Sequence, residues 1–246
     1  MRSPDEQPGY DLPYVREELG SRSLHFSDAA IQSRMDLLRP DALVLEYTRT
    51  MMGVLMFVPE PACLAIVGLG GGSLVRFCHR HLPRTRVTAI EQNPHVIALR
   101  ERFSVPPDGP RLRVVHDDGA RHLATTPERY DAILIDAFGT AGMPESLGTR
   151  RFYDDAVDAL RPGGLLVANL HAGHPHVDIH VERLRAAVDA PVLRVDDRDG
   201  TNSVVFARRG APLRAHPRVA AAASELRDAW SRIGRALTAM QRGAPG

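Results

Sequence analysis

The sequence predicts an α/β protein with a doubly wound, mostly parallel sheet of seven strands, preceded by a small N-terminal β unit. Two observations support this fold class. From residue 63 onward, apolar runs alternate with amphipathic segments, as in repeated βα units. The runs themselves are almost continuously apolar, which is typical of strands that are buried on both faces. Ligands of such sheets bind at the carboxyl ends of the strands, so we look for chemistry there.

Residues 1–62 differ from the rest of the chain and are expected to form an N-terminal β-hairpin and helix extension. The segment YVREELGSRSLHF, residues 14–26, alternates polar and apolar residues around Gly20, which predicts a hairpin. The segment LEYTRTMMGVLMF, residues 45–57, has the apolar spacing of a helix and ends before Pro59.

Residues 63–212 supply the repeating units of the Rossmann-like sheet. Strands are expected at 63–69, 86–91, 112–118, 130–138, 165–170, 191–196 and 202–209, and helices at 73–82, 93–103, 150–160 and 178–188. Asn93 followed by Pro94 is a favourable helix start, because Asn caps the helix and Pro fits its first position.

Residues 213–246 are expected to form a C-terminal amphipathic helix. Its apolar stripe consists of Leu226, Trp230, Ile233, Leu237 and Met240. Such a stripe either packs on its own domain or forms the seam of a dimer. The sequence does not choose between these, so a homodimer stays open.

Composition excludes several classes of function. A formal net charge of +1 gives no bulk electrostatic reason to expect nucleic acid or an anionic membrane as partner. All 31 basic residues are arginine, so Schiff-base chemistry by lysine is excluded. Cys63 and Cys78 lack metal-binding spacing and are expected to be buried, reduced thiols. No apolar signal-peptide core or membrane-length run is present, and we expect a cytoplasmic protein with a small-molecule partner.

A glycine-rich turn, GLGGG at 68–72, follows the first strand of the main domain. Gly68, Gly70 and Gly72 would let backbone N–H groups approach a ligand with no Cβ in the way. The dinucleotide fingerprint G-x-G-x-x-G fails because Ser73 occupies the position of its last glycine, and the P-loop fails for lack of Gly-Lys. The turn alone is therefore a weak signal.

Acidic residues at three successive strand ends strengthen it. Glu91 lies nineteen positions after Gly72, close to the spacing at which an acid binds a ribose hydroxyl. Asp118, with Asp117 before it and Gly119 after it, ends the third strand, and Asp136 ends the fourth. Each acid alone could be a helix cap or turn former. Together they predict a nucleoside site on one edge of the sheet.

The run IVGLGGGSL…AIEQNPHVI…VVHDDGARHL…YDAILIDAFG…RFYDDAVDALRPGGLLVANL resembles the spermidine-synthase-like branch of the class I S-adenosylmethionine-dependent transferases. The likeness covers about residues 25–210 and includes AIQSRMD before the main domain. It implies that residues 63–212 form a class I methyltransferase-like catalytic domain. The cofactor would be S-adenosylmethionine or its decarboxylated form.

The resemblance also implies roles for single residues. The three turn glycines would support the nucleoside and its tail, Glu91 would bind the ribose, and Asp118 beside Gly119 the adenine. Gln32 would contact the nucleoside from the N-terminal side. Asp136 would lie at the transfer site and deprotonate or orient the nucleophile.

Three positions depart from the polyamine-specific pattern of this family. Gly71 and Gly139 replace acids that bind cationic substrates, and a polyamine-holding tyrosine falls on Leu45 in an ungapped alignment, two positions from Tyr47. Two lost charge-assisted hydrogen bonds, at roughly 1.5–3 kcal/mol each, would weaken polyamine recognition by orders of magnitude. The sequence therefore favours methyl transfer from intact S-adenosylmethionine to a small amine or hydroxyl acceptor. Aminopropyl transfer from the decarboxylated cofactor and non-catalytic nucleoside binding are the alternatives; Glu145 or Asp117 could supply the missing charge.

Four histidines follow the fifth strand: His171, His174, His176 and His180. His176 and His180 have the i, i+4 spacing of a helical metal pair, but no acid stands between them as a metalloprotease helix would need, and the chemistry needs no metal. We expect no metal site. His171 and Asn169 are the residues best placed to line an acceptor pocket, with Tyr47 approaching it from the N-terminal segment.

Overall fold

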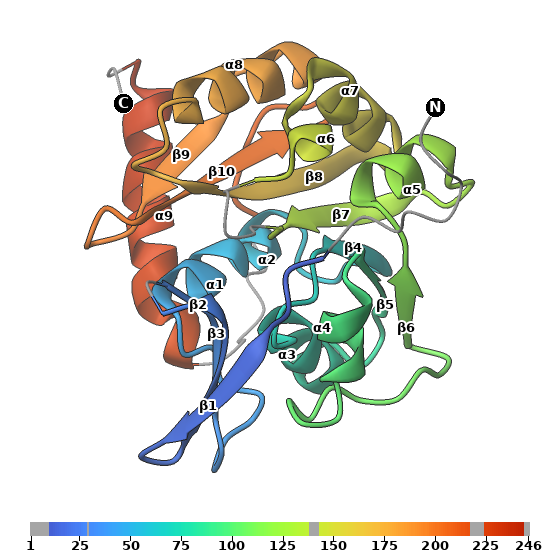
Figure 1. Cartoon of the computed structure of the whole chain (residues 1–246). Helices are drawn as coiled ribbons and strands as arrows, with labels where there is room; N and C mark the ends of the chain where they lie inside the picture. Colours follow the sequence, from blue (N-terminus) through green and yellow to red (C-terminus); the bar gives the residue numbers. More distant parts are fainter. Residues whose placement is uncertain (1–9, 29, 138–142, 217–223, 244–246) are drawn as a thin grey trace.

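The main body of the computed structural model, which describes residues 10–28, 30–137, 143–216 and 224–243, is a seven-stranded sheet with the order β6-β5-β4-β7-β8-β10-β9 (Figure 1). Its strands are β4 (Cys63–Val67), β5 (Arg86–Glu91), β6 (Leu112–His116), β7 (Tyr130–Ile135), β8 (Leu160–His171), β9 (Leu193–Asp196) and β10 (Asn202–Arg208). In this sheet β10 pairs antiparallel with its neighbours β8 and β9, and the other pairs are parallel. The predicted fold class is confirmed.

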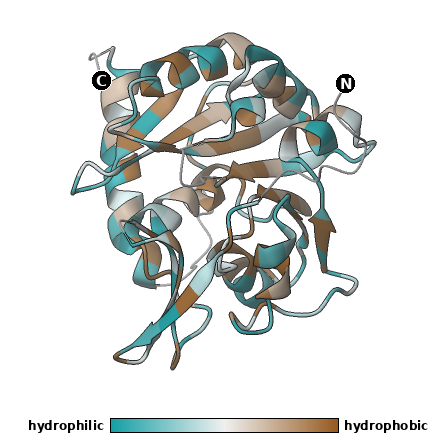
Figure 2. Ribbon diagram, viewed as in Figure 1, coloured by the Kyte–Doolittle hydropathy of each residue, from teal (hydrophilic) through white to brown (hydrophobic). Residues whose placement is uncertain are grey.

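Both faces of the sheet are buried, because alternate residues of each strand enter different cores. In β4, Leu64 and Ile66 belong to one core, and Ala65 and Val67 to the other. One face is covered by α1 (Glu46–Met51), α2 (Val54–Phe57), α3 (Ser73–His81), α4 (Pro94–Ala98) and α9 (Arg227–Gln241). The other is covered by α5 (Gly119–Thr125), α6 (Glu145–Gly148), α7 (Arg150–Asp158) and α8 (Val177–Val188). Figure 2 shows the resulting hydrophobic strands between helices with hydrophilic outer faces.

The N-terminal unit contains three antiparallel strands, one more than the hairpin predicted. They are β1 (Tyr14–Glu18), β2 (Ser21–Ser27) and β3 (Ala30–Asp36). β3 coincides with AIQSRMD, a segment that the hydrophobic pattern did not identify as a strand. Its residues Ser33 and Met35 are buried while Ile31 is exposed, so the period-two pattern is present but short.

Three predicted elements have different bounds in the structure. The helix at 45–57 is broken into α1 and α2 at Gly53, where a Cβ would lie 2.2 Å from Ile233 Cδ1 of the packed helix α9. The helix at 93–103 ends at Ala98, and the chain then turns so that Phe103 is buried. Residues 161–164, expected to close a helix, belong instead to the beginning of β8.

The C-terminal helix packs on its own domain. Leu226, Ile233 and Leu237 are buried, and Trp230 and Met240 contact the same core. This confirms docking as the role of the predicted stripe. Residues 217–223 of the predicted helix lie outside the described part of the chain.

Cys63 and Cys78 are both free and buried, as predicted. Burial raises the pKa of the Cys78 thiol to about 12. No helix in the described ranges is long and apolar enough to cross a membrane.

Candidate active site at the carboxyl edge of the sheet

The glycine turn and Asp136 meet where the strand order reverses, between β4 and β7. The Asp136 amide donates a hydrogen bond to the Val67 carbonyl oxygen at 2.8 Å. Gly68, with φ of +97°, passes so close that a Cβ would lie 2.1 Å from the Asp136 carbonyl oxygen. Only glycine permits this approach. Such a reversal is where open α/β sheets bind their ligands.

The other two predicted turn glycines serve different ends. Beside Gly70 the space is open, since the nearest atom to a Cβ placed there would be Ser33 Cβ at 4.0 Å. A Cβ on Gly72 would lie 2.2 Å from Val105 Cγ2. Gly70 thus leaves room for a ligand at the turn, whereas Gly72 permits close packing of the protein on itself.

Glu91 is tied to the turn. Its carboxylate accepts hydrogen bonds from the Leu69 amide at 2.9 Å and from the Asn93 amide at 2.8 Å. Each carboxylate oxygen keeps a further acceptor site, so the side chain can still receive a ribose hydroxyl. Its ribose role stays a prediction.

Asp118 acts as the N-cap of α5, accepting from the Arg121 amide at 2.9 Å and from Ser146 Oγ at 3.2 Å. Its adenine role also stays a prediction. The adjacent Asp117 forms an ion pair with Arg121 and is therefore not a free negative charge. Gly119 lies against β4, where a Cβ would be 2.5 Å from Val67 Cγ1.

Asp136 is held by two neutral donors. Tyr47 Oη donates to its Oδ2 at 3.3 Å, and Asn169 Nδ2 donates to its Oδ1 at 3.1 Å. Burial raises the pKa of Asp136 to about 6, although both hydrogen bonds favour the charged form. Asn169 is buried, and its Oδ1 has no partner among the described residues. The arrangement provides a carboxylate that is ionised at neutral pH and basic enough to accept a proton.

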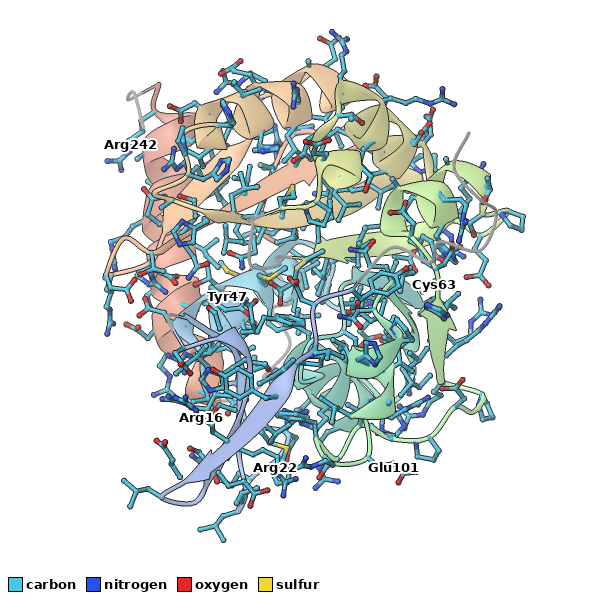
Figure 3. All side chains as sticks on the ribbon, viewed as in Figure 1. Arg16, Arg22, Tyr47, Cys63, Glu101 and Arg242 are labelled. Carbon is cyan, nitrogen blue, oxygen red and sulfur yellow. The ribbon has the colours of Figure 1, made fainter. Side chains whose placement is uncertain are left out.

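Tyr47, labelled in Figure 3, reaches this carboxylate from α1. Burial, followed by the charges of Asp136 and Asp197, raises its pKa well above the ordinary value, so Tyr47 remains a neutral donor. The tyrosine at this site is Tyr47. Leu45, which the ungapped alignment selected, is the N-cap residue of α1.

Ser33 is the β3 side chain that contacts the turn, with its Oγ 3.2 Å from Ser73 Oγ. Gln32 precedes it, and successive strand residues point to opposite faces, so the predicted contact of Gln32 with the nucleoside remains untested. A Cβ on Gly71 would lie 2.7 Å from Ser33 Oγ and 3.0 Å from Phe103 Cδ1. The missing acid at position 71 is thus matched by side chains that fill its space. Gly139 lies outside the described residues.

Sequence reasoning missed Arg76, a buried guanidinium below the turn. It donates to the carbonyl oxygens of Phe103, at 2.7 Å, and of Gly71 and Pro40. These three carbonyls come from separate segments, so Arg76 fixes the turn against its surroundings. A single arginine in a helical pattern carries no sequence signal for this role.

The histidines do not gather into one site. His171 is exposed at the end of β8, and its acceptor role stays a prediction. His180 is buried and its Nδ1 is 3.1 Å from Tyr153 Oη, so it packs inside the domain. Within the described ranges no cluster of three or more His, Cys, Asp or Glu side chains is arranged to hold a metal ion.

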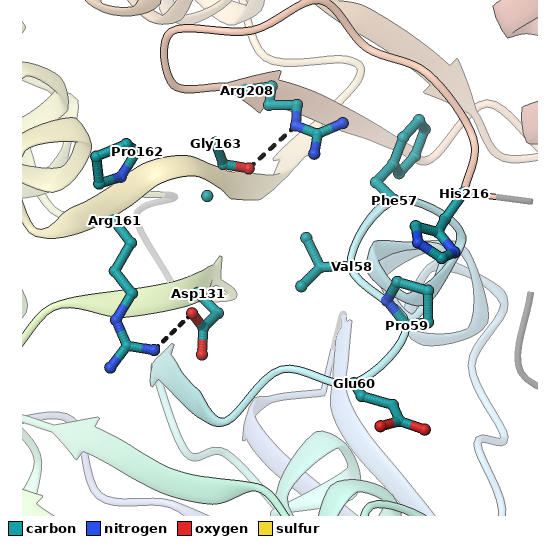
Figure 4. A pocket seen from close by; sticks show the side chains of 11 residues that line it. Phe57, Val58, Pro59, Glu60, Asp131, Arg161, Pro162, Gly163, Arg208 and His216 are labelled. Carbon is teal, nitrogen blue, oxygen red and sulfur yellow. Dashed lines mark hydrogen bonds and ion pairs between the residues drawn. The ribbon is translucent and has the colours of Figure 1, made fainter. Parts of the chain in front are cut away.

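A separate cavity of about 530 Å³ lies at the opposite edge, by the beginnings of β7 and β8 (Figure 4). Its lining includes the ion pair of Arg161 with Asp131 and the Arg208 side chain bound to the Gly163 carbonyl. Its described lining contains none of the predicted site residues.

Known proteins resemble this chain in sequence and in fold. The family model described as "Spermine/spermidine synthase domain" matches residues 44–184. A Chromobacterium violaceum protein named polyamine aminopropyltransferase is 37% identical over 199 residues, which cover 80% of this chain and 76% of that protein. The structure of a probable spermidine synthase from Corynebacterium glutamicum aligns with a TM-score of 0.72 at 20% identity, covering 91% of this chain and 82% of that one.

Human methyltransferase-like protein 13, solved in complex with SAH, aligns with a TM-score of 0.61 at 22% identity, covering 79% of this chain and 93% of that one. The structural likenesses, taken alone, define the class: a Rossmann-like fold shared with methyltransferases. The sequence comparisons go further. The chain belongs to the spermine/spermidine synthase family and is a transferase. The preference for methyl transfer drawn from Gly71 and Gly139 finds no support in these comparisons.

Proposed function

We propose that this transferase moves an aminopropyl group from decarboxylated S-adenosylmethionine to a small amine, with Asp136 as the base. The observation that carries the proposal is the carboxylate of Asp136 held between Tyr47 and Asn169 beside the glycine turn. That it stands in a chain 37% identical to a protein named polyamine aminopropyltransferase supports the aminopropyl donor over the methyl donor.

The residues of the turn edge fit a nucleoside donor. Open space beside Gly70 admits a ligand, and Glu91 presents acceptor capacity next to it. When bound, the donor supplies a carbon made electrophilic by its sulfonium. The protein contributes proximity, orientation and removal of a proton.

Asp136 takes the proton that the acceptor ammonium must lose before its nitrogen lone pair can attack. A carbon–nitrogen bond then forms as the carbon–sulfur bond breaks, and the sulfur leaves as the thioether of methylthioadenosine. Tyr47 and Asn169 donate to the ionised carboxylate and so hold it in place without competing as bases. The raised pKa of Asp136, about 6, improves its basicity while leaving it unprotonated near pH 8.

The test is product analysis with each donor. Purified protein is incubated with decarboxylated or intact S-adenosylmethionine and a panel of amines, and products are identified by mass. We expect methylthioadenosine from the decarboxylated donor only. S-adenosylhomocysteine from the intact donor, without methylthioadenosine, would overturn the proposal in favour of methyl transfer.

Asp136→Asn tests the base. Because a positioned general base contributes about 10²–10⁴-fold, we expect kcat to fall by that factor. Asp154→Asn, on the solvent-facing side of α7, is the matched control and should keep full activity. Equal activity of both variants would remove Asp136 from the mechanism.

A further inference from the structure

Asp197 is a second carboxylate on the same rim of the sheet as Asp136. It directly follows β9, which is antiparallel to β10 and therefore runs in the same direction as β7 and β8. Only 8% of Asp197 is exposed. Its Oδ2 accepts from Asn202 Nδ2 at 3.3 Å, while its Oδ1 is buried with no partner among the described residues.

No cation of the described part of the chain forms an ion pair with Asp197. The guanidinium whose charge acts on it, that of Arg232, pairs with Glu46 at 2.8 Å. It also donates to Thr50 Oγ1 at 3.0 Å and to the Asp196 carbonyl oxygen at 3.1 Å. Arg232 is thus already committed, and a buried carboxylate without a cation is unfavourable unless a ligand provides one.

Tyr47 links this carboxylate to the transfer site. Its hydroxyl donates to Asp136, and it lies close enough to Asp197 to feel its charge. The groups around Asp197 add to the negative potential, since Glu46 and Asp199 outnumber Arg232 there. This side of the site therefore attracts a cation.

We propose that Asp197 binds the distal ammonium group of a diamine acceptor whose reacting nitrogen lies at Asp136. The inference rests on the proposed function and specifies its acceptor: a chain with two cationic ends, in preference to a monoamine. β8 and β10 separate β7 from β9, so the two strand ends lie on the order of 14 Å apart, three strand spacings. The distal ammonium would donate to the unpartnered Oδ1 in a charge-assisted hydrogen bond.

The experiment compares diamines of four to eight carbons with monoamines of the same lengths. Asp197→Asn is expected to raise KM for diamines by about 10- to 100-fold, as loss of one charge-assisted bond predicts, and to leave kcat/KM for monoamines unchanged. Asp196→Asn is the control, because Asp196 is exposed and pairs with Arg194. An equal effect of Asp197→Asn on both amine classes would overturn the inference while leaving aminopropyl transfer intact.

A second measurement separates this role from a structural one. Burial and the charge of Glu46 raise the folded pKa of Asp197 to about 6, above its ordinary 3.8. The ionised form therefore destabilises the ligand-free fold above pH 6, and this penalty fades as pH falls toward 4. Asp197→Asn should melt at a higher temperature than the wild type at pH 8, with the difference shrinking at lower pH.

Diamine binding, followed by calorimetry, completes the test and needs no turnover. The wild type should bind the diamine more tightly than Asp197→Asn by the same 10- to 100-fold. If Asp197 instead neutralised Arg232, the variant would melt lower than the wild type at pH 8, which would contradict the proposal. If the wild type yields no methylthioadenosine yet binds diamines through Asp197, the proposed reaction fails and the cation site stands.

Discussion

The carboxylate of Asp136 has a neutral donor on each oxygen, and this pairing sets its working pH range. Burial pushes its pKa upward, while Asn169 and Tyr47 pull it back toward the ordinary value. The balance, a pKa of about 6, leaves a base that is ionised in neutral solution. Removing either donor shifts the balance toward the protonated acid.

Tyr47→Phe should therefore move the acidic limb of the kcat/KM profile. In the wild type we expect activity to rise with pH through about 6, as Asp136 loses its proton. Without the hydroxyl the pKa of Asp136 increases, so the limb moves to higher pH. The measurement is kcat/KM between pH 5 and 9, and Tyr14→Phe, whose hydroxyl binds Asp28 in the N-terminal hairpin, is the control. An unmoved limb would mean that the Tyr47 hydroxyl does not act on Asp136.

Glu91, Asp118 and Asp136 could be selected from the sequence because each follows an apolar strand. Asp197 could not, because it stands in the acidic, glycine-containing segment DDRDG and has the composition of a turn. Tyr47 was named but not paired, since the sequence gives no register between α1 and β7. Contacts between distant segments, such as Arg76 with Pro40, are likewise invisible before folding.

At the scale of elements, strands were easier to predict than helices. Continuous apolar runs identified every strand of the main sheet, whereas helix ends depended on packing. Gly53 breaks the predicted helix at 45–57 because Ile233 of α9 occupies the space beside it. The helix at 93–103 stops early, with Ser104 at a φ of +52° in the turn that buries Phe103. Neither neighbour can be seen within its own segment.

The junction of β4, its turn and β7 should tolerate no side chain at Gly68. Gly68→Ala adds left-handed strain and a clash with the Asp136 backbone, which together should lower the free energy of unfolding by about 2–5 kcal/mol. Gly200→Ala shares the positive φ, +69°, but meets open space, so about 1 kcal/mol is expected. Urea denaturation compares the two, and equal losses would show that the close approach is unimportant.

Over the whole molecule, α9 closes the core beneath the N-terminal unit. Figure 1 shows it running along the edge of the molecule beside β9 and α1. Its residue Ile233 is fully buried and contributes to the core that also holds Phe206. The last helix of the chain thus supports the helix that carries Tyr47.

Ile233→Ala should cost about 2–5 kcal/mol of unfolding free energy, because it leaves a cavity in this shared core. Arg235→Ala, exposed on the same helix, should change stability by less than about 0.5 kcal/mol. Thermal denaturation followed by circular dichroism measures both. A loss for Ile233→Ala no larger than the control's would mean that α9 adds little to the fold.

The crowding of Gly71 by Ser33 and Phe103 limits what a single substitution can do at the turn. An engineer who placed aspartate there to strengthen amine binding would first have to make room by shortening side chains on a neighbouring strand and loop. Selectivity is more readily altered at the hairpin joining the last two strands of the sheet, where charge can be exchanged without disturbing the nucleoside cradle.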